Sequence, residues 1–159
     1  MELHTSRNPA DYAELVAELG PELGPEFGEA IERWCLLLPR HRPLAHWEIY
    51  LAIAESQTIG ITGLYRLPDA PLTEAWLGWF GVLRRARRRR HGSTLLALTV
   101  QRALELGASD FLICVALHST GAQQFYMRNG FRLLPRSEWP RHYRLYDDTD
   151  VILHRKLCA

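Results

Sequence analysis

One segment near the middle of the chain combines the residue types that bind phosphate groups. Six arginines lie between Arg84 and Arg90, and Gly92, Ser93 and Thr94 follow them at the expected start of a helix. The unpaired N–H groups and the positive dipole end of a helix N-terminus attract anions, and glycine allows a ligand to approach the backbone. The pattern predicts a site for a compound with several phosphates. From this segment alone, a solvated arginine face with a permissive glycine cap is the alternative.

Two common phosphate-binding motifs are absent, because no GxGxxG follows a strand and no GxxxxGK[ST] occurs. The segment instead resembles the acetyl-CoA motif of the GNAT superfamily of N-acetyltransferases, V-x-x-x-x-[QR]-x-x-G-x-[GA] running into a helix. Val82 stands at the valine position, Arg87 at the Gln/Arg position and Gly92 at the second glycine. Arg90 replaces the first glycine. A side chain at that position restricts the backbone geometry of the loop.

A second motif supports the same resemblance. A later helix of the family often reads N-x-x-A-x-x-[FL]-Y-x-x-x-G-F, and the chain matches it from Ser119 to Phe131 with only the opening Asn replaced by Ser119. The two motifs occur in the order of the family, separated by a helix and a buried strand. The resemblance covers roughly residues 47–157.

The resemblance implies an α/β protein with the GNAT fold, as one domain over residues 1–159. Its central sheet would be mixed and mostly antiparallel, with one splayed parallel strand pair and about four flanking helices. Acetyl-CoA would be the co-substrate, its pantetheine arm lying in the splayed gap like an added strand. A backbone N–H near residues 80–83 would polarise the thioester carbonyl. The residues implied at the cofactor site are Val82, Leu83, Arg87, Arg88, Arg89, Arg90, His91, Gly92, Ser93, Thr94, Ser119 and Tyr126.

Tyr126 falls where the family places the tyrosine that protonates the departing CoA thiolate. A phenol, whose reference pKa is about 10, stays protonated at neutral pH and is able to donate to a thiolate. A buried ring on an amphipathic helix is the structural alternative for this residue.

The general base is less well defined by the sequence. Strand alternation places a set of residues on one face, namely Glu74, Trp76, Gly78, Phe80 and Val82. Histone-type members of the family carry a Glu at the position of Trp76, and Glu74 lies one dyad away from it. His118, at the end of the next parallel strand, is a second candidate with Asp147 and Asp148 behind it. For each candidate, a surface or turn role is the alternative.

Neither a metal site nor a covalent intermediate is predicted. His41 and His46 give no helical metal-binding face, and no acidic cluster accompanies them. No Ser or Cys lies on a nucleophile elbow, which favours direct attack by an amine in a ternary complex. The acceptor is left open among small molecules, amino acids and peptides. Four aromatic residues would either line its cleft or pack in the core: Trp47, Tyr50, Trp76 and Trp79.

The elements that must position these residues follow from hydrophobic periodicity and from breaking residues. Helices are expected from Asn8-Pro9 to Gly20-Pro21 and from Pro25 to just before Pro39. An antiparallel hairpin is expected over 47–54 and 59–67, followed by a strand–helix–strand unit over 75–83, 92–106 and 111–117. A short helix over 121–129 and closing strands over 131–134 and 151–157 complete the expected order.

Composition narrows the function classes. The 159 residues carry a formal charge of +1, from 19 basic and 18 acidic side chains, which argues against a dedicated nucleic-acid or membrane binder. Cys35, Cys114 and Cys158 form no disulfide framework or CxxC pair. The opening segment is too polar for a signal peptide and no apolar run approaches membrane-spanning length, so a cytoplasmic protein is expected. The oligomeric state stays open, a homodimer included.

Three functions are therefore compared. The favoured one is an N-acetyltransferase that moves the acetyl group of acetyl-CoA to a primary amine. The first rival is a GNAT-fold module that binds an acyl-CoA without transferring the acyl group. The second is a nucleic-acid-binding domain built around the arginine run, which lacks the interleaved aromatic residues that such surfaces use.

Overall fold

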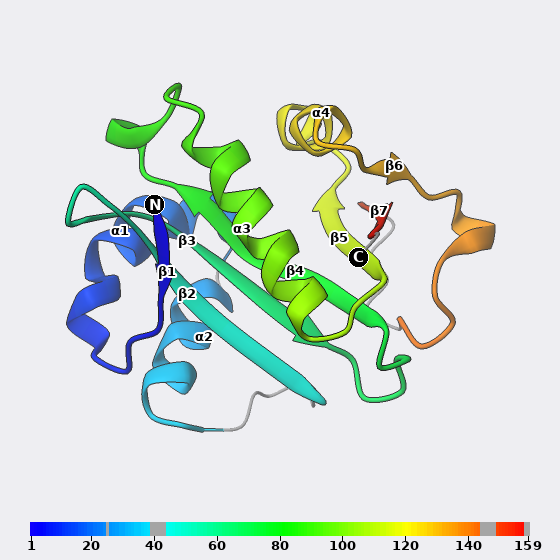
Figure 1. The fold of residues 1–159 in the computed structure, drawn as a ribbon, viewed down its shortest axis with the longest axis horizontal. Coiled ribbons are helices and arrows are strands. Elements are labelled where there is room, and N and C mark those ends of the chain that lie inside the picture. The colour runs from blue at the N-terminus through cyan, green and yellow to red at the C-terminus, as the bar shows by residue number, and fades with distance from the viewer. Residues whose placement is uncertain (25, 39–43, 144–148, 158–159) are drawn as a thin grey trace.

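The computed structural model describes residues 1–24, 26–38, 44–143 and 149–157. Its core is a mixed sheet with the strand order β1-β2-β3-β4-β5-β7-β6 (Figure 1). The strands are β1 (Glu2–His4), β2 (His46–Ala54), β3 (Gln57–Arg66), β4 (Glu74–Val82), β5 (Asp110–Ala116), β6 (Arg132–Leu133) and β7 (Asp150–Lys156). Among the described strands, only β4 and β5 pair in parallel, which confirms the predicted fold class. Strand β1 was not expected from the sequence.

Four α-helices of the described chain cover the sheet: α1 (Ala13–Leu23), α2 (Glu26–Cys35), α3 (His91–Glu105) and α4 (Thr120–Arg128). Helices α1 and α2 pack on one face and α3 and α4 on the other (Figure 1). Short 3-10 turns occur at Pro9–Tyr12, Arg84–Ala86 and Arg136–Glu138. The apolar stripes of the helices thus enclose one hydrophobic layer on each side of the sheet.

The expected ends of the first two helices need correction. Helix α1 continues through Pro21 to Leu23 and stops at Gly24, whose φ is +92°. Proline removes one backbone donor without blocking the last turn, so glycine rather than proline ends the helix here. Helix α2 ends at Cys35, so Leu38 is exposed instead of completing its apolar stripe. Pro25, Pro39, His41, Asp147, Asp148 and Cys158 lie outside the described residues.

Strand β4 contains a β-bulge that reverses the facing of its second half. Its pairing with β3 shifts register between Gly63↔Gly78 and Ile61↔Gly81, and Trp79 has a φ of +50°. A bulge inserts one extra residue, so alternation resumes on the opposite face. Phe80 and Val82 consequently lie on the α3 and α4 side with Ala75 and Leu77, whereas Trp76 lies on the other side. The predicted common face for Glu74, Trp76, Gly78, Phe80 and Val82 is therefore wrong.

Strands β4 and β5 are paired only at their N-terminal ends. Their register runs from Glu74↔Asp110 to Leu77↔Ile113, although β4 continues to Val82 and β5 to Ala116. Beyond Leu77 and Ile113 the two strands part, which confirms the expected splayed pair. In this part, the backbone of β4 has no partner on the β5 side among the strands that the structure describes.

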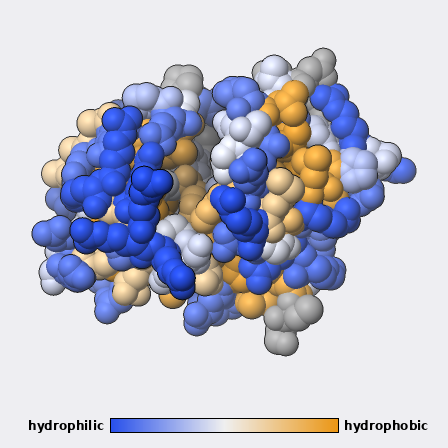
Figure 2. All heavy atoms as spheres, turned by 90° about the horizontal axis from the view of Figure 1, so that it is seen from above, coloured by the Kyte–Doolittle hydropathy of each residue, from blue (hydrophilic) through white to orange (hydrophobic). Residues whose placement is uncertain are grey.

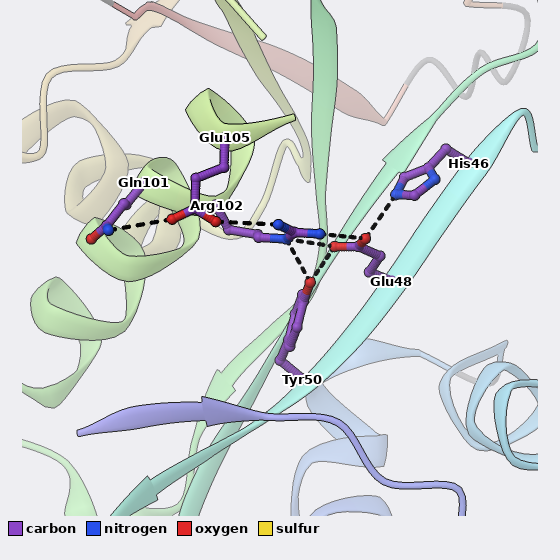
Figure 3. A network of polar contacts seen from close by, with 6 residues as sticks. All are labelled: His46, Glu48, Tyr50, Gln101, Arg102 and Glu105. Atoms are coloured by element: carbon purple, nitrogen blue, oxygen red, sulfur yellow. Dashed lines mark hydrogen bonds and ion pairs between the residues drawn. The ribbon is translucent and has the colours of Figure 1, made fainter. Parts of the chain in front are cut away.

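Helix α3 is fixed to the sheet by buried polar contacts. Arg102 donates to both oxygens of Glu48 at 2.9 and 3.0 Å, and Tyr50 also donates to Glu48 (Figure 3). Burial raises the pKa of Glu48, but the hydrogen bonds from Arg102 and Tyr50 outweigh it and the net pKa lies below its usual value. Thr62 of β3 and Thr99 of α3 add a buried hydroxyl pair at 3.0 Å. These contacts fix the direction in which the N-terminus of α3 points.

Candidate active site

A cleft of about 470 Å³ opens where β4 and β5 part. Its walls come from both strands, from the ends of α1 and α2, from α4 and from the start of β7. Figure 2 views the end of the molecule where the β4–α3 loop and α4 lie, and it shows a hollow between a strongly hydrophilic part and a more apolar part of the surface. The cleft thus lies within the sheet, between the two strands that are parallel to each other in the described chain.

Tyr126 of α4 lines this cleft. Its side chain is 7% exposed, and its hydroxyl has no hydrogen-bond partner among the described residues. The ring is held by Phe80, Phe125 and Phe131, with ring centroids 5.2 to 6.0 Å away. Burial raises the pKa of Tyr126, so the phenol keeps its proton at neutral pH. The position supplies a rigid O–H donor whose partner must come from outside the described chain.

The N-terminus of α3 lies open at the end of the β4–α3 loop. Arg90 precedes the helix with φ +62° and ψ +5°, so it adopts the left-handed conformation for which glycine is favoured. No side chain caps the helix there. The replacement of glycine by Arg90 therefore leaves the loop with the backbone shape that glycine would give. The helix start remains available to an anion.

The arginine run is divided into two groups. Arg84, Arg85 and Arg87 bind acidic residues of α1: Arg85 contacts Glu14 at 2.9 Å, and Arg87 contacts Glu22 at 2.8 Å. Arg84 binds Glu18 through its backbone N–H and lies 3.8 Å from Glu22 through its side chain. The second group, Arg88, Arg89 and Arg90, is exposed and makes no ion pair with any described residue. The first group fastens the loop to α1, and the second leaves three positive charges beside the helix N-terminus.

Gly92 faces α4 without any packing constraint. A Cβ at this position would lie 3.5 Å from the ring of Phe125, an ordinary contact, so the protein interior does not require glycine there. His91, Ser93 and Thr94 share the first turn of α3, and Thr94 returns a hydrogen bond to the carbonyl of Arg90. Packing within the described chain therefore does not account for the glycine at this position.

The structure places Val82 and Leu83 within the protein's own hydrogen-bond network. The carbonyl of Val82 accepts from Arg87 at 2.8 Å, and the N–H of Leu83 donates to the carbonyl of Ile59 at 2.9 Å. Ser119 precedes α4, makes no side-chain cap and lines the cleft. The bulge residues Gly78, Trp79 and Phe80 line the cleft itself.

The two candidate bases lie away from the cleft lining. Glu74 is buried at the paired end of β4, where Trp76 donates to it at 2.6 Å and His142 lies 2.7 Å away. His118 is exposed in the turn after β5. The structure brings neither of them to Tyr126. The assignment of either residue as the general base stays a prediction.

Sequence reasoning missed a polar group on the other side of the cleft. Cys114, Tyr143 and Asp150 all line it, and the Tyr143 hydroxyl donates to the Cys114 sulfur at 2.8 Å. Burial, together with the Asp150 carboxylate, raises the pKa of Cys114 to about 12, although the hydrogen bond from Tyr143 lowers it. Asp150 reaches this group only through the pairing of β7 with β5, where it lies opposite Ala116. No local sequence signal announces such a long-range pairing.

Comparison with known proteins identifies the family of the chain. The family model described as the acetyltransferase (GNAT) family matches residues 11–131. The chain belongs to the GNAT acetyltransferase family. It is also 26% identical over 122 residues to an uncharacterised N-acetyltransferase, YycN, of Bacillus subtilis strain 168, a match that covers 76% of this chain and 69% of that protein.

Several solved GNAT structures share the fold. An acetyltransferase of the GNAT family from Staphylococcus aureus Mu50 has a TM-score of 0.72 at 20% identity, over 99% of this chain and 98% of that one. An acetyltransferase from Streptococcus agalactiae 2603 has a TM-score of 0.75 at 19% identity, over 98% of both chains. The PaiA N-acetyltransferase from Thermoplasma acidophilum, solved with coenzyme A, has a TM-score of 0.62 at 17% identity, over 99% of this chain and all of that one.

Two further observations concern this GNAT chain. Within its described residues, no three His, Cys, Asp or Glu side chains are grouped as ligands of a metal ion would be. None of the described helices is both long and apolar enough to cross a membrane.

Proposed function

We propose that the protein is an acetyl-CoA-dependent N-acetyltransferase that acts on a primary amine by direct attack in a ternary complex. The observation that carries this proposal is Tyr126, a residue that is 7% exposed, lines the cleft of a GNAT fold and has a hydroxyl without a hydrogen-bond partner among the described residues. A hydroxyl that lines a cleft and makes no hydrogen bond within the protein is able to donate to a ligand there. The leaving sulfur of a thioester bound between β4 and β5 supplies such a partner.

The cofactor is proposed to bind along the splayed strand and across the start of α3. The pyrophosphate would lie on the first N–H groups of the helix, from His91 to Thr94, with Arg88, Arg89 and Arg90 adding positive charge. The pantetheine arm would take the place of the strand that β4 lacks beyond Leu77. This arrangement would bring the thioester to the bulge, whose residues Gly78, Trp79 and Phe80 line the cleft.

The reaction needs one proton donor and no covalent enzyme intermediate. The neutral amine nitrogen attacks the thioester carbon, a C–N bond forms, and the C–S bond then breaks. The departing thiolate takes the proton of Tyr126, and the proton lost by the amine replaces it through solvent. Cys114 also lines the cleft, but its raised pKa keeps it a thiol, a poor nucleophile. Direct attack by the amine is therefore favoured over a thioester on Cys114.

The test removes only the hydroxyl. Tyr126→Phe keeps the ring packing, and general acid catalysis contributes about 10²- to 10⁴-fold, so we expect kcat to fall within that range while the affinity for acetyl-CoA stays close to the parent value. Tyr12→Phe is the matched control, because Tyr12 is equally buried but donates to Ser6 far from the cleft. Thiol release gives kcat, and calorimetry gives the affinity.

The same experiment separates the enzyme from the rival binding module. Acetyl-CoA that binds tightly without acetyl transfer to any amine in a broad panel would favour a non-catalytic module. Equal kcat for Tyr126→Phe and the parent, with chemistry shown to limit turnover, would reduce Tyr126 to a packing residue.

A further inference from the structure

The cleft has a second side, opposite the one proposed for the cofactor. Along β5, Ile113 and Val115 point into the layer under α3 and α4, whereas Cys114 packs with the opposite layer. Asp150 lies opposite Ala116 in the β5–β7 pairing, and paired residues share a face, so Asp150 lies on the Cys114 side. Tyr126 therefore enters the cleft from one face of the sheet, and the group of Cys114, Tyr143 and Asp150 enters it from the other.

The charged side chains that line the cleft are all acidic, with no Lys, Arg or His among the described lining residues. The carboxylates are Glu22, Glu26 and Asp150. Glu22 is compensated by Arg87 at 2.8 Å. Asp150 has no cationic partner within the described chain, and its recorded neighbour is the neutral thiol of Cys114. A half-buried carboxylate in this position is stabilised by a ligand that brings a positive charge.

Aromatic rings complete this side of the cleft. Tyr65, Trp79 and Tyr143 line it. The rings of Tyr65 and Trp79 lie 6.1 Å apart, and Tyr143 is stacked on Trp76 at 4.8 Å, which fixes the rings in place. Faces of Trp and Tyr attract ammonium groups and also accommodate their alkyl chains. A carboxylate-bearing acceptor, such as an amino acid, would find no described cation on the cleft wall to balance its second charge.

We infer that the acceptor is a cationic amine without any anionic group, and that Asp150 holds its ammonium before deprotonation. The inference rests on the proposed acetyl transfer. Acidic residues alone would not define the site, but the same cleft is lined by Tyr126, which is more than nine-tenths buried and whose hydroxyl lacks a partner among the described residues. The aromatic and acidic side thus receives the amine, and the Tyr126 side receives the leaving sulfur.

Three probes with the same five-carbon chain test the substrate class: pentylamine, 1,5-diaminopentane and 6-aminohexanoate. They differ only in what the fifth carbon bears: a hydrogen, an ammonium group or a carboxylate group. We expect kcat/KM for 6-aminohexanoate to be at least about 10-fold below the values for the other two amines. Its carboxylate would be repelled by the acidic cleft or left without a partner there, and either effect costs a factor of this order. This comparison uses the parent protein and needs no variant.

Asp150→Asn tests the residue, with Asp69→Asn as the matched control because Asp69 is exposed in the turn between β3 and β4 and does not line the cleft. We expect KM for pentylamine to rise about 10- to 100-fold in Asp150→Asn, the effect of losing one hydrogen bond to a charged group, and to stay unchanged in Asp69→Asn. The affinity for acetyl-CoA should not change in either variant.

The outcomes separate this inference from the proposed function. Efficient use of 6-aminohexanoate, or an unchanged KM in Asp150→Asn, would overturn the acceptor assignment and leave acetyl transfer standing. Failure of every amine, anionic and cationic alike, to release CoA from bound acetyl-CoA would overturn both.

Discussion

Replacing Arg90 with glycine isolates the cost of the left-handed backbone at the start of α3. Arg90 has a φ of +62°, a conformation that costs a residue with a Cβ about 1–2 kcal/mol. Glycine escapes this cost but loses about 0.5–1 kcal/mol because its unfolded state is more flexible. The net expectation for Arg90→Gly is a gain of about 0.5–1 kcal/mol in the free energy of unfolding. Urea unfolding without cofactor measures it directly.

Arg89→Gly is the matched control, because Arg89 lies in the same loop, is equally exposed and has no positive φ. Only the entropic cost of glycine applies to Arg89→Gly, so it should lose about 0.5–1 kcal/mol. The two variants remove the same charge, and they should therefore differ by about 1–2 kcal/mol. Equal destabilisation of both variants would refute the argument that the loop holds Arg90 in a strained conformation.

Two other predictions concern the cofactor site and the support of α3. Gly92→Asp places a carboxylate over the first turn of α3, where the protein itself leaves room, so calorimetry should show a large loss of acetyl-CoA affinity in a protein that remains folded; unchanged affinity would move the phosphates elsewhere. Glu48→Gln should lower the free energy of unfolding by about 2 kcal/mol at pH 7, since it loses charged hydrogen bonds to Arg102. Because the pKa of Glu48 is lowered in the folded state, this contribution is present above the usual value of 4.5 and is lost as the pH falls through the folded pKa. Urea unfolding from pH 7 to pH 3 should show the parent converging on the variant, and a difference that does not depend on pH would contradict the assignment.

The order of elements could be predicted because local signals mark it. Gly107 and Gly130, both with positive φ, follow α3 and α4 where the sequence places helix ends. The runs of apolar residues in β4 and β5 predict buried parallel strands, and the structure pairs them in parallel. The predicted end of the first helix at Gly20-Pro21 was wrong, because the helix tolerates proline near its C-terminus.

The site was predictable only on its cofactor side. The strand-to-helix turn and Tyr126 lie in continuous motifs, whereas Asp150 reaches the cleft through a strand pairing that spans more than thirty residues of sequence from Ala116. The prediction of the sheet face on which Phe80 lies was wrong for a different reason. Nothing in the sequence of β4 reveals the extra residue of a bulge. Side-chain alternation predicts the face of a residue only where the register with the partner strand is regular.

Glu22 belongs at once to the loop and to the cleft. Its carboxylate pairs with Arg84 and Arg87 of the loop beside α3, and the same residue lines the space proposed for the acceptor. If cofactor phosphates attract those arginines, the balance of charge that an incoming amine meets changes with them. By thermodynamic linkage such an effect is reciprocal, so each substrate changes the affinity for the other by the same factor. In that case Glu22 of α1 would couple the proposed cofactor and acceptor sites electrostatically, without any movement of the sheet.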